Sequence, residues 1–509
     1  MTPLGRGLLG AVIGTMITLV AHPATSPYFT APFRTVSLAQ IKVRPALPAP
    51  VDPASAAYWM ETAAEKLQHG TSLSPDELDT LTKLSAEASV SQPDNAFWPQ
   101  IRAVLLYYQA KGDLARQEWF KASRRSSWDD LQTVRLVNEH ARLCRSLGSD
   151  QSWTLGYTYF ERSDAAAAQI QRYCETLVQH TEVDNVSGLL IRYASIRNGS
   201  LLRSGSRSIR VGIHGAQMVE QSTYPPSMGG SRTPKRIWIA RTNITARLRQ
   251  ANMVDEASIA DEAFKNNEAW LALTERRNPD ENVRNLCVAS IGLASFAGCQ
   301  GIGLLAGLLI FGLGCLLERR FSERKRFPAP LVIAAAFGVW LLVFLTIGSW
   351  IAAASVGCTL CFLIAGPKTV RTRRTDDLGP LYNVIVFGLW ILSVAGFSVF
   401  LISTSPAARA LLPRLGPAGE YLQDSRIFLG VTYISLSLLC LVAPGWSIVR
   451  RYGTPDMFAV TLKKFGAMGA VLGIVLCILS GPVVLSADRY CGKQLQQILT
   501  NEPVYYLLP

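Results

Sequence analysis

The stretch "NAFWPQIRAVLLYYQAKGDLARQEWFKAS", residues 95–123, predicts two short helices that fold back on each other. Apolar residues recur at helical spacing on both sides of Gly112 and Asp113, a pair that is typical of a tight turn. Similar helical patterns fill most of the first 285 residues, whereas alternating patterns are rare. We therefore expect an all-α chain, with "RIWIARTNI" at 236–244 as the one predicted strand.

Helix start signals recur through this region. They are Asp52-Pro53, the capping box Ser74-Pro75-Asp76-Glu77, Ser127-Trp128-Asp129-Asp130, and Ser163-Asp164 before "AAAAQIQRYCETLVQH". Gly70 suits the end of the first of these helices, and the helix opened at Ser127 should reach about Ser146. A last helix is expected over about 255–277.

The composition changes at Cys287, after which long apolar runs alternate with short basic clusters. A membrane-spanning helix needs about 20 mostly apolar residues. Six spans are predicted, at about 290–316, 328–346, 350–366, 380–403, 427–449 and 465–486. Gly303, Gly307, Gly469 and Gly473 within these runs indicate close helix packing. With the amino-terminal segment, the fold class is a helical domain plus about seven transmembrane helices.

The charge pattern predicts which side each part occupies. The chain has 509 residues and a formal net charge of +13, and much of the excess lies in loops between the apolar runs. Such loops stay on the cytoplasmic side, and the first holds Arg319, Arg320, Arg324, Lys325 and Arg326. Residues 54–285 and the tail 487–509 are then extracytoplasmic, in a multi-pass protein of the cell membrane. This placement argues against a nucleic-acid partner.

The first 26 residues resemble an export signal, because Arg6 precedes a short apolar core. They are either a signal anchor or a cleaved signal peptide, and we favour the anchor because Pro27 follows the best cleavage spacing. Residues 27–53 form a Pro/Ala-rich linker before the helical domain of 54–285.

The hairpin of residues 95–123 is similar to tetratricopeptide repeats, which are helix–turn–helix units. Large and small residues match that family's packing positions, namely Trp98, Tyr107, Tyr108, Trp119-Phe120 and Ala122. The resemblance covers about thirty residues, and its internal spacing departs from the regular repeat. It implies a groove that binds a peptide or protein, with Trp98, Tyr107, Tyr108 and Trp119 as possible contacts. The alternative is that these aromatic residues only form the core.

Eleven cations and a single acid, Glu220, lie between 185 and 250. Arg203, Arg207 and Arg210 are spaced to share one helical face. They are candidates for contact with anionic lipid or an acidic envelope polymer. The alternative is an ordinary solvated helix face.

The sequence contains no catalytic motif. The five histidines lack ligand spacing, and there is no zinc helix, phosphate loop or nucleophile elbow. We expect no enzyme activity, cofactor or metal. Cys358 and Cys361 are more typical of helix packing than of a redox pair. For Cys144 and Cys174 in the helical domain, a disulfide is the less favoured alternative.

The six apolar cores contain no Asp, Glu, Lys, Arg or His, which disfavours a coupled pump or an intramembrane enzyme. We therefore expect a non-enzymatic membrane protein whose extracytoplasmic domain binds a protein or envelope partner. The alternative is a membrane subunit of a transporter that relies on a separate ATPase. The order of one span, an external domain and then several spans resembles the topology of some export permeases.

Overall fold

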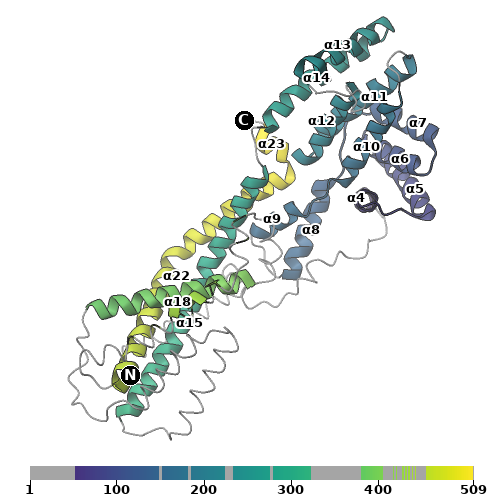
Figure 1. Cartoon of the computed structure of the whole chain (residues 1–509). Helices are drawn as coiled ribbons and strands as arrows, with labels where there is room; N and C mark the ends of the chain where they lie inside the picture. The colour runs from purple at the N-terminus through teal and green to yellow at the C-terminus, as the bar shows by residue number, and fades with distance from the viewer. Residues whose placement is uncertain are drawn as a thin grey trace. The chain divides into compact units, whose positions relative to one another are not determined.

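The computed structural model describes residues 52–147, 152–181, 185–223, 233–275, 279–322, 380–404 and 454–507, with isolated positions between 417 and 442 (Figure 1). These residues are helical and contain no strand, apart from one isolated bridge between Asn95 and Ser127. The all-α prediction is confirmed.

The chain divides into two compact units. The helical domain comprises Lys42–Arg145, Thr154–Asn285 and Gly492–Pro509, and the second unit comprises Met1–Ile41, Ser146–Trp153 and Leu286–Cys491. The carboxy-terminal tail, here residues 492–509, thus belongs to the same unit as the helical domain. The tail was predicted only to lie on the same side of the membrane as that domain.

The helices of the domain follow one another closely. They are α4 (Pro53–Gln68), α5 (Pro75–Ser91), α6 (Phe97–Tyr108), α7 (Gly112–Ser123), α8 (Gln132–Leu147), α9 (Ser152–Phe160), α10 (Ala165–Gln179), α11 (Val186–Gly205), α12 (Ile209–Thr223), α13 (Pro234–Gln250), α14 (Val254–Glu275) and α23 (Glu502–Leu507). Three long helices supply most of the described second unit, namely α15 (Pro279–Ser322), α18 (Pro380–Thr404) and α22 (Thr454–Thr500). The unit boundaries fall within α8, α9, α15 and α22.

Local sequence signals set the first two helices as predicted. The Asp52 carboxylate accepts a hydrogen bond of 2.7 Å from Ser55 N, and Gly70 follows α4 with a φ of +75°. Before α5, the Ser74 hydroxyl accepts from Glu77 N at 3.2 Å and the Glu77 carboxylate accepts from Ser74 N at 2.9 Å. The capping box is confirmed. The predicted helices after Ser163-Asp164 and near 255–277 correspond to α10 and α14.

The helix predicted to open at Ser127 begins instead at Gln132. Residues 127–131 form a hydrogen-bonded connection, in which Ser127 N donates to Asp94 O at 3.1 Å and the indole of the buried Trp128 donates to Gln100 Oε1 at 2.9 Å. Trp128 is 3% exposed. The packing of Trp128 against α6 outweighs the local preference for a helix start, so the predicted start was wrong, whereas the helix itself and its end near Ser146 are confirmed by α8.

The predicted strand at 236–244 is also wrong, because these residues lie within α13. Thr233 caps the helix by accepting from Arg236 N, and Pro234 occupies its first turn. Ile244 and Leu248, four residues apart, are both buried in a core cluster that includes Phe264 of α14. The helical spacing of these two buried residues therefore determines the secondary structure, rather than the strand-like alternating pattern at 236–239.

The core of the domain is formed by α4, α5, α6, α7, α10, α11 and α12. Trp98 is fully buried and Trp119 is 1% exposed. The α11–α12 pair approaches closely at Gly199 and Gly215, since a Cβ atom added at Gly199 would lie 2.7 Å from Gly215 O. Such contact admits no side chain without a shift of the backbone.

Glycines also set the packing of α15 against α22 in the second unit. A Cβ atom at Gly307 would lie 2.6 Å from Ala470 N, and one at Gly473 would lie 2.9 Å from Leu304 Cβ. One at Gly469 would lie 2.5 Å from the Trp390 indole nitrogen of α18. The predicted close packing at these three glycines is confirmed.

The apolar runs 290–316, 380–403 and 465–486 fall within α15, α18 and α22. The runs between 328 and 366 lie outside the described residues, as do Cys358, Cys361 and the segment 1–26, and 427–449 is described only at isolated positions. In the part of the chain that the structure describes, no helix combines the length and hydropathy of a bilayer-crossing segment.

Replacement of Gly307 by Ala should separate α15 from α22, because the added methyl group meets backbone atoms that cannot move aside cheaply. We expect a loss of roughly 1–3 kcal/mol of stability, seen as a lower melting temperature of the purified full-length chain. Gly312→Ala on the same helix is the matched control, because its Cβ would meet no atom within 4 Å. Equal melting temperatures of the two variants would contradict the close packing.

Candidate binding surfaces and a buried carboxylate clasp

The two tryptophans of the α6–α7 hairpin lie inside the domain. The Trp98 indole donates to Gln92 Oε1 at 2.7 Å, and the Trp119 indole donates to Ser195 Oγ at 3.0 Å. Both side chains are buried and hydrogen-bonded. Trp98 and Trp119 therefore form part of the core, as the alternative interpretation of the hairpin predicted, and a partner could not contact them.

Tyr107 and Tyr108 lie at the end of α6 and keep part of their surface in solvent. They are 43% and 39% exposed. Their rings contact each other at a centroid distance of 5.8 Å, and Tyr107 also contacts Tyr173 of α10 at 5.4 Å. The Tyr108 hydroxyl donates to Gln169 Oε1 at 3.1 Å. These contacts hold the two exposed rings in place.

Two buried polar groups lie beneath this aromatic surface. Among the residues that the structure describes, the Tyr173 hydroxyl and the Gln169 side-chain nitrogen have no hydrogen-bond partner. Burial raises the pKa of Tyr173 above its ordinary value, so the hydroxyl keeps its proton and can donate. The surface therefore combines exposed aromatic area with hydrogen-bonding capacity just below it.

The three arginines predicted to share a helical face do not do so. α11 ends at Gly205 and α12 begins at Ile209, so Arg203 and Arg210 belong to different helices. Arg203 is 5% exposed and donates to Asn267 Oδ1 at 2.7 Å and to Ala263 O at 3.3 Å. Burial lowers the pKa of Arg203 to about 10.

Arg210 is paired with Asp280 at 3.2 Å, whereas the Arg207 side chain is exposed. The predicted common surface of Arg203, Arg207 and Arg210 is therefore wrong as a set. The sequence signal that could have shown the break between the two helices is Ser204-Gly205-Ser206, because a Ser-Gly pair is typical of a turn.

Arg192, from the same basic run, joins the ends of two helices. Its guanidinium donates to Ser222 O of α12 at 2.8 Å and to Thr181 O, just beyond α10, at 3.2 Å. The last carbonyl groups of a helix lack partners within the helix, so a buried cation there satisfies them. Burial lowers the pKa of Arg192 from its ordinary value. An arginine inside an apolar stripe was the only available sequence signal for this role.

A fully buried carboxylate, that of Glu502, belongs to a cluster that we call the carboxylate clasp, formed by Tyr159, Arg162, Asp280 and Glu502. Arg162 binds Glu502 through two hydrogen bonds, of 2.7 Å to Oε2 and 3.2 Å to Oε1. The Arg162 side chain is 5% exposed and that of Glu502 is fully buried. Glu502 is the first residue of α23, which Figure 1 shows in yellow.

The Glu502 carboxylate takes further hydrogen bonds within the clasp. Ile209 N, at the start of α12, donates to Oε2 at 2.9 Å, so a helix amino terminus also favours the negative charge. The Tyr159 hydroxyl lies 2.8 Å from Glu502 Oε1 and 2.9 Å from Asp280 Oδ1, and its one hydrogen serves one acceptor at a time. These donors offset the desolvation of the carboxylate.

The electrostatics of the clasp keep the arginine charged. Burial is the largest single influence and acts to lower the pKa of Arg162, but the charge and hydrogen bonds of Glu502 together with Tyr159 and Asp280 outweigh it, and the net shift of the pKa is upward. Arg162 also lies over the Tyr159 ring, 3.7 Å from its centroid. Burial raises the pKa of Tyr159, which therefore remains a hydrogen-bond donor.

Other contacts hold the tail along the same domain. Thr133 Oγ1 donates to Thr500 O at 3.1 Å, Glu502 N donates to Arg207 O at 3.0 Å, and Asn282 Nδ2 donates to the Tyr506 hydroxyl at 3.0 Å. The tail is thus an integral part of the helical domain.

A second buried cluster joins α4 to α8. Arg135 Nη2 lies 3.8 Å from Glu61 Oε2 and 3.9 Å from Asp130 Oδ2, so one cation faces two carboxylates. Desolvation raises the pKa of Asp130 to about 6, Arg135 opposes that rise, and the charge of Glu61 adds to it. Asp130 therefore titrates well above the ordinary range of an aspartate.

Cys144 and Cys174 do not pair with each other. The Cys174 sulfur is buried 3.8 Å from Ser222 Oγ, and burial raises the pKa of that thiol to about 11. The Cys144 sulfur lies 3.3 Å from His140 Nε2. Within the described ranges, no group of three His, Cys, Asp or Glu side chains could hold a metal ion.

Of the basic cluster predicted to set the topology, Arg319 and Arg320 lie near the end of α15. Arg324, Lys325 and Arg326 lie outside the described residues. No family model matches the chain, and neither does a curated protein or a solved structure. The likeness to tetratricopeptide repeats therefore gains no support, and function is inferred from the geometry of this chain.

Glu502→Gln should release the tail, because it leaves the Arg162 charge buried without its counter-ion. Breaking a buried pair in this way costs about 3–5 kcal/mol. We expect limited proteolysis of the full-length chain to remove residues near 500 much faster than in the wild type. Arg249→Ala, which breaks an exposed pair with Asp261, should leave the cleavage rate unchanged. Unchanged cleavage in both variants would contradict the clasp.

Asp130 should make the domain less stable as the pH rises from about 4 to about 6. The carboxyl group holds its proton more tightly in the folded chain than in the unfolded one, so folding is favoured below this range and the contribution is lost through it. The difference is at most about 3 kcal/mol. It is measured from unfolding midpoints across this pH range.

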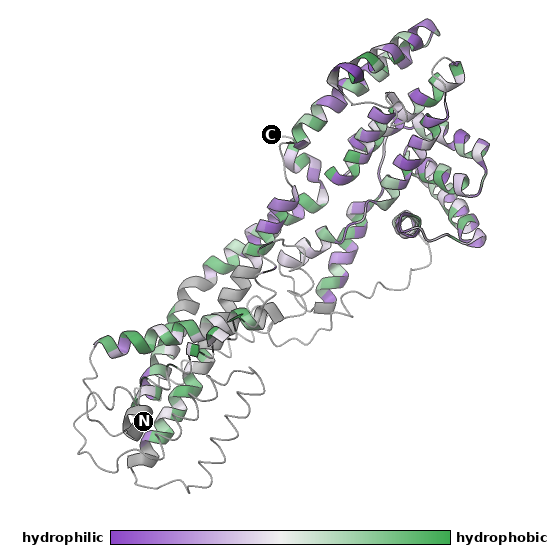
Figure 2. Ribbon diagram, in the orientation of Figure 1, coloured by the Kyte–Doolittle hydropathy of each residue, from purple (hydrophilic) through white to green (hydrophobic). Residues whose placement is uncertain are grey.

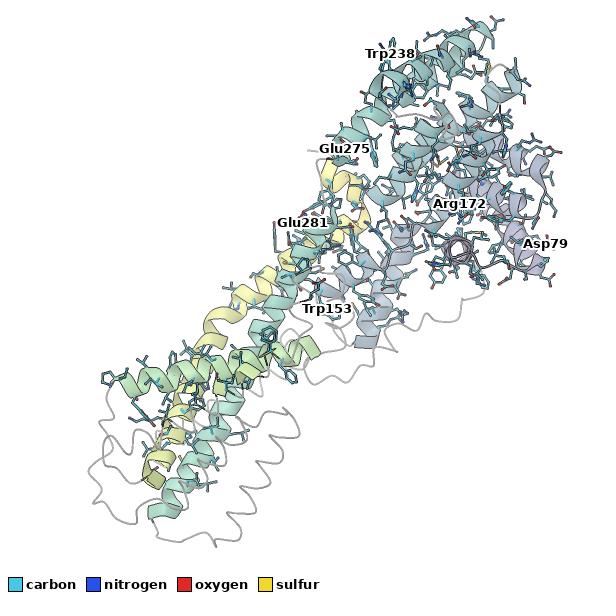
Figure 3. The ribbon with its side chains drawn as sticks, viewed as in Figure 1. Asp79, Trp153, Arg172, Trp238, Glu275 and Glu281 are labelled. Atoms are coloured by element: carbon cyan, nitrogen blue, oxygen red, sulfur yellow. The ribbon has the colours of Figure 1, made fainter. Side chains whose placement is uncertain are left out.

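Asp130→Asn should flatten that dependence, because the amide cannot ionise while its oxygen still accepts from Gln132 N. Asp79→Asn is the control, since the Asp79 side chain is 61% exposed (Figure 3). A wild-type curve and an Asp130→Asn curve that stay parallel between pH 4 and 6 would refute the assignment.

Proposed function

We propose that the chain is a non-enzymatic, multi-pass membrane protein whose extracytoplasmic helical domain binds a protein or envelope partner. The carboxylate clasp carries the proposal. The tail and the domain share a buried ion pair and must therefore lie in one compartment. An even number of membrane crossings must then separate residue 285 from the tail, and the six spans predicted from the sequence meet that condition.

The exposed apolar side chains of the second unit support the proposal that lipid surrounds it. Large apolar side chains of α15, α18 and α22 are exposed, including Leu309 (68%), Leu316 (65%), Leu381 (62%), Val384 (66%) and Val483 (64%). Figure 2 shows apolar residues along much of α18, whereas polar residues are frequent on the helices of the domain. A contiguous apolar surface is unfavourable in water and ordinary in lipid.

The partner surface that we propose is the exposed pair Tyr107 and Tyr108. Tyrosine combines a large apolar ring with a polar tip, and it is enriched among residues that dominate binding energy. The buried contacts with Tyr173 and Gln169 hold both rings in place before binding, which reduces the entropic cost of association.

Reporter fusions test the membrane arrangement. We expect a reporter near residue 210 and one after residue 509 to behave as exported, and one near residue 322 to behave as cytosolic. Neutral substitutions at Arg319, Arg320, Arg324, Lys325 and Arg326 should scramble this orientation. A cytosolic reporter after residue 509 together with an exported one near 210 would contradict the proposal.

Crosslinking in intact cells followed by purification tests the partner surface. Tyr107→Ser combined with Tyr108→Ser should abolish capture of an envelope-side partner, whereas Val90→Ser, at a position 82% exposed on α5, should not. Circular dichroism checks that each variant folds. Capture of a cytoplasmic nucleotide-binding protein that survives the double substitution would favour the transporter-subunit alternative.

A further inference from the structure

The helix pair α13–α14 carries the most exposed tryptophan among the described residues. Trp238 is 65% exposed, and Figure 3 shows it on the outer side of the pair. The neighbouring Ile239 is 42% exposed, and Leu273 of α14 is 46% exposed. Ile244 and Leu248 already pack α13 against α14. The exposed apolar side chains are therefore not needed for this packing, and together they indicate an interaction surface.

Two ion pairs show that these exposed side chains belong to one end of the pair. Arg241 binds Glu268 at 3.3 Å, and Arg249 binds Asp261 at 2.7 Å. The two helices are therefore antiparallel, and the first turns of α13 lie beside the last turns of α14. We call this end, formed by Lys235, Arg236, Trp238, Ile239 and Leu273, the basic aromatic patch.

The cations of the patch are not used within the domain. Arg241 and Arg249 have acidic partners, whereas Lys235 and Arg236 are exposed and form no ion pair with any described residue. Both lie in the first turn of α13, where a positive charge opposes the helix dipole. The fold therefore gains nothing from them at this position, and an external anion would neutralise them.

The position of the patch along the chain indicates which anion. Only residues 276–289 separate the end of α14 from the first predicted span. Tryptophan beside lysine and arginine is typical of the interface between water and lipid, where the indole lies at the level of the head groups. A protein partner is less favoured, because the residues of a binding hot spot lie in well-packed pockets, whereas Trp238 is 65% exposed.

We propose that the basic aromatic patch binds anionic phospholipid head groups of the membrane in which the chain is anchored. Lys235 and Arg236 contact the phosphate groups, and Trp238, Ile239 and Leu273 enter the interfacial region. This inference rests on the proposed membrane location. It differs from the earlier prediction for Arg203, Arg207 and Arg210, because it uses cations and apolar groups that the fold leaves exposed.

A photo-reactive benzoylphenylalanine in place of Trp238 tests this contact in the full-length chain. The protein is reconstituted in vesicles of phosphatidylcholine alone or with phosphatidylglycerol added. We expect lipid adducts at position 238 in the anionic vesicles, and few with the same probe at Val90. Lys235→Ser combined with Arg236→Ser should reduce the adducts, by roughly fivefold for each cation removed, and so should high salt.

The inference is overturned by equal adduct yields in neutral and anionic vesicles, by a yield no higher than at Val90, or by adducts with protein instead of lipid. Resistance of the chain to extraction by alkaline carbonate tests the membrane location separately. If the chain proves extractable, the same probe is used with anionic vesicles added from outside. Lipid adducts in that experiment would support the inference although the proposed membrane location had failed. Their absence would contradict both the inference and the proposed membrane location.

Discussion

A buried ion pair joins the carboxy-terminal tail to the helical domain. Arg162 and Glu502 lie 340 positions apart in the sequence, yet their side chains are 5% and 0% exposed and form two hydrogen bonds with each other. Desolvating such a pair is costly, so it is retained only where further donors complete it. Here Ile209 N and Tyr159 supply them. Because the pair requires its two chain segments to meet, the chain between them must leave the helical domain and return to it.

Buried arginines join helices in this all-helical domain. The last carbonyl groups of a helix lack partners within the helix, and Arg192 binds such groups at the ends of α10 and α12. Arg203 instead binds the middle of α14, through the Ala263 carbonyl and the side-chain oxygen of Asn267. The basic run at 185–250 therefore contains both cations that hold helices together and cations that remain on the surface. Lys235 and Arg236 belong to the second kind.

Local features of the fold could be predicted from the sequence. Asp52, Ser74 and Gly70 act through neighbouring residues, and the structure uses them as their spacing suggests. Prediction failed where distant packing decides. Trp128 is held by Gln100, so residues 127–131 do not become helical, and α13 is helical because its face fits α14.

The binding surfaces could be predicted only in part. Sequence patterns identified the aromatic hairpin, but the depth of each ring depends on α10 and α11, which separates the buried Trp98 and Trp119 from the exposed Tyr107 and Tyr108. The clasp could not be predicted at all. Asn501-Glu502-Pro503 indicates the start of a short helix, yet nothing in the sequence pairs its glutamate with Arg162.

A double-mutant cycle on Arg162 and Glu502 tests the central claim most directly. Arg162→Met, Glu502→Gln and the combined variant are compared with the wild type by the unfolding free energy of the full-length chain. Each single change leaves a buried group without its partner, whereas the double change removes both charges. We predict that the double variant loses much less stability than the two single variants together. Strictly additive losses would show that the two side chains do not interact.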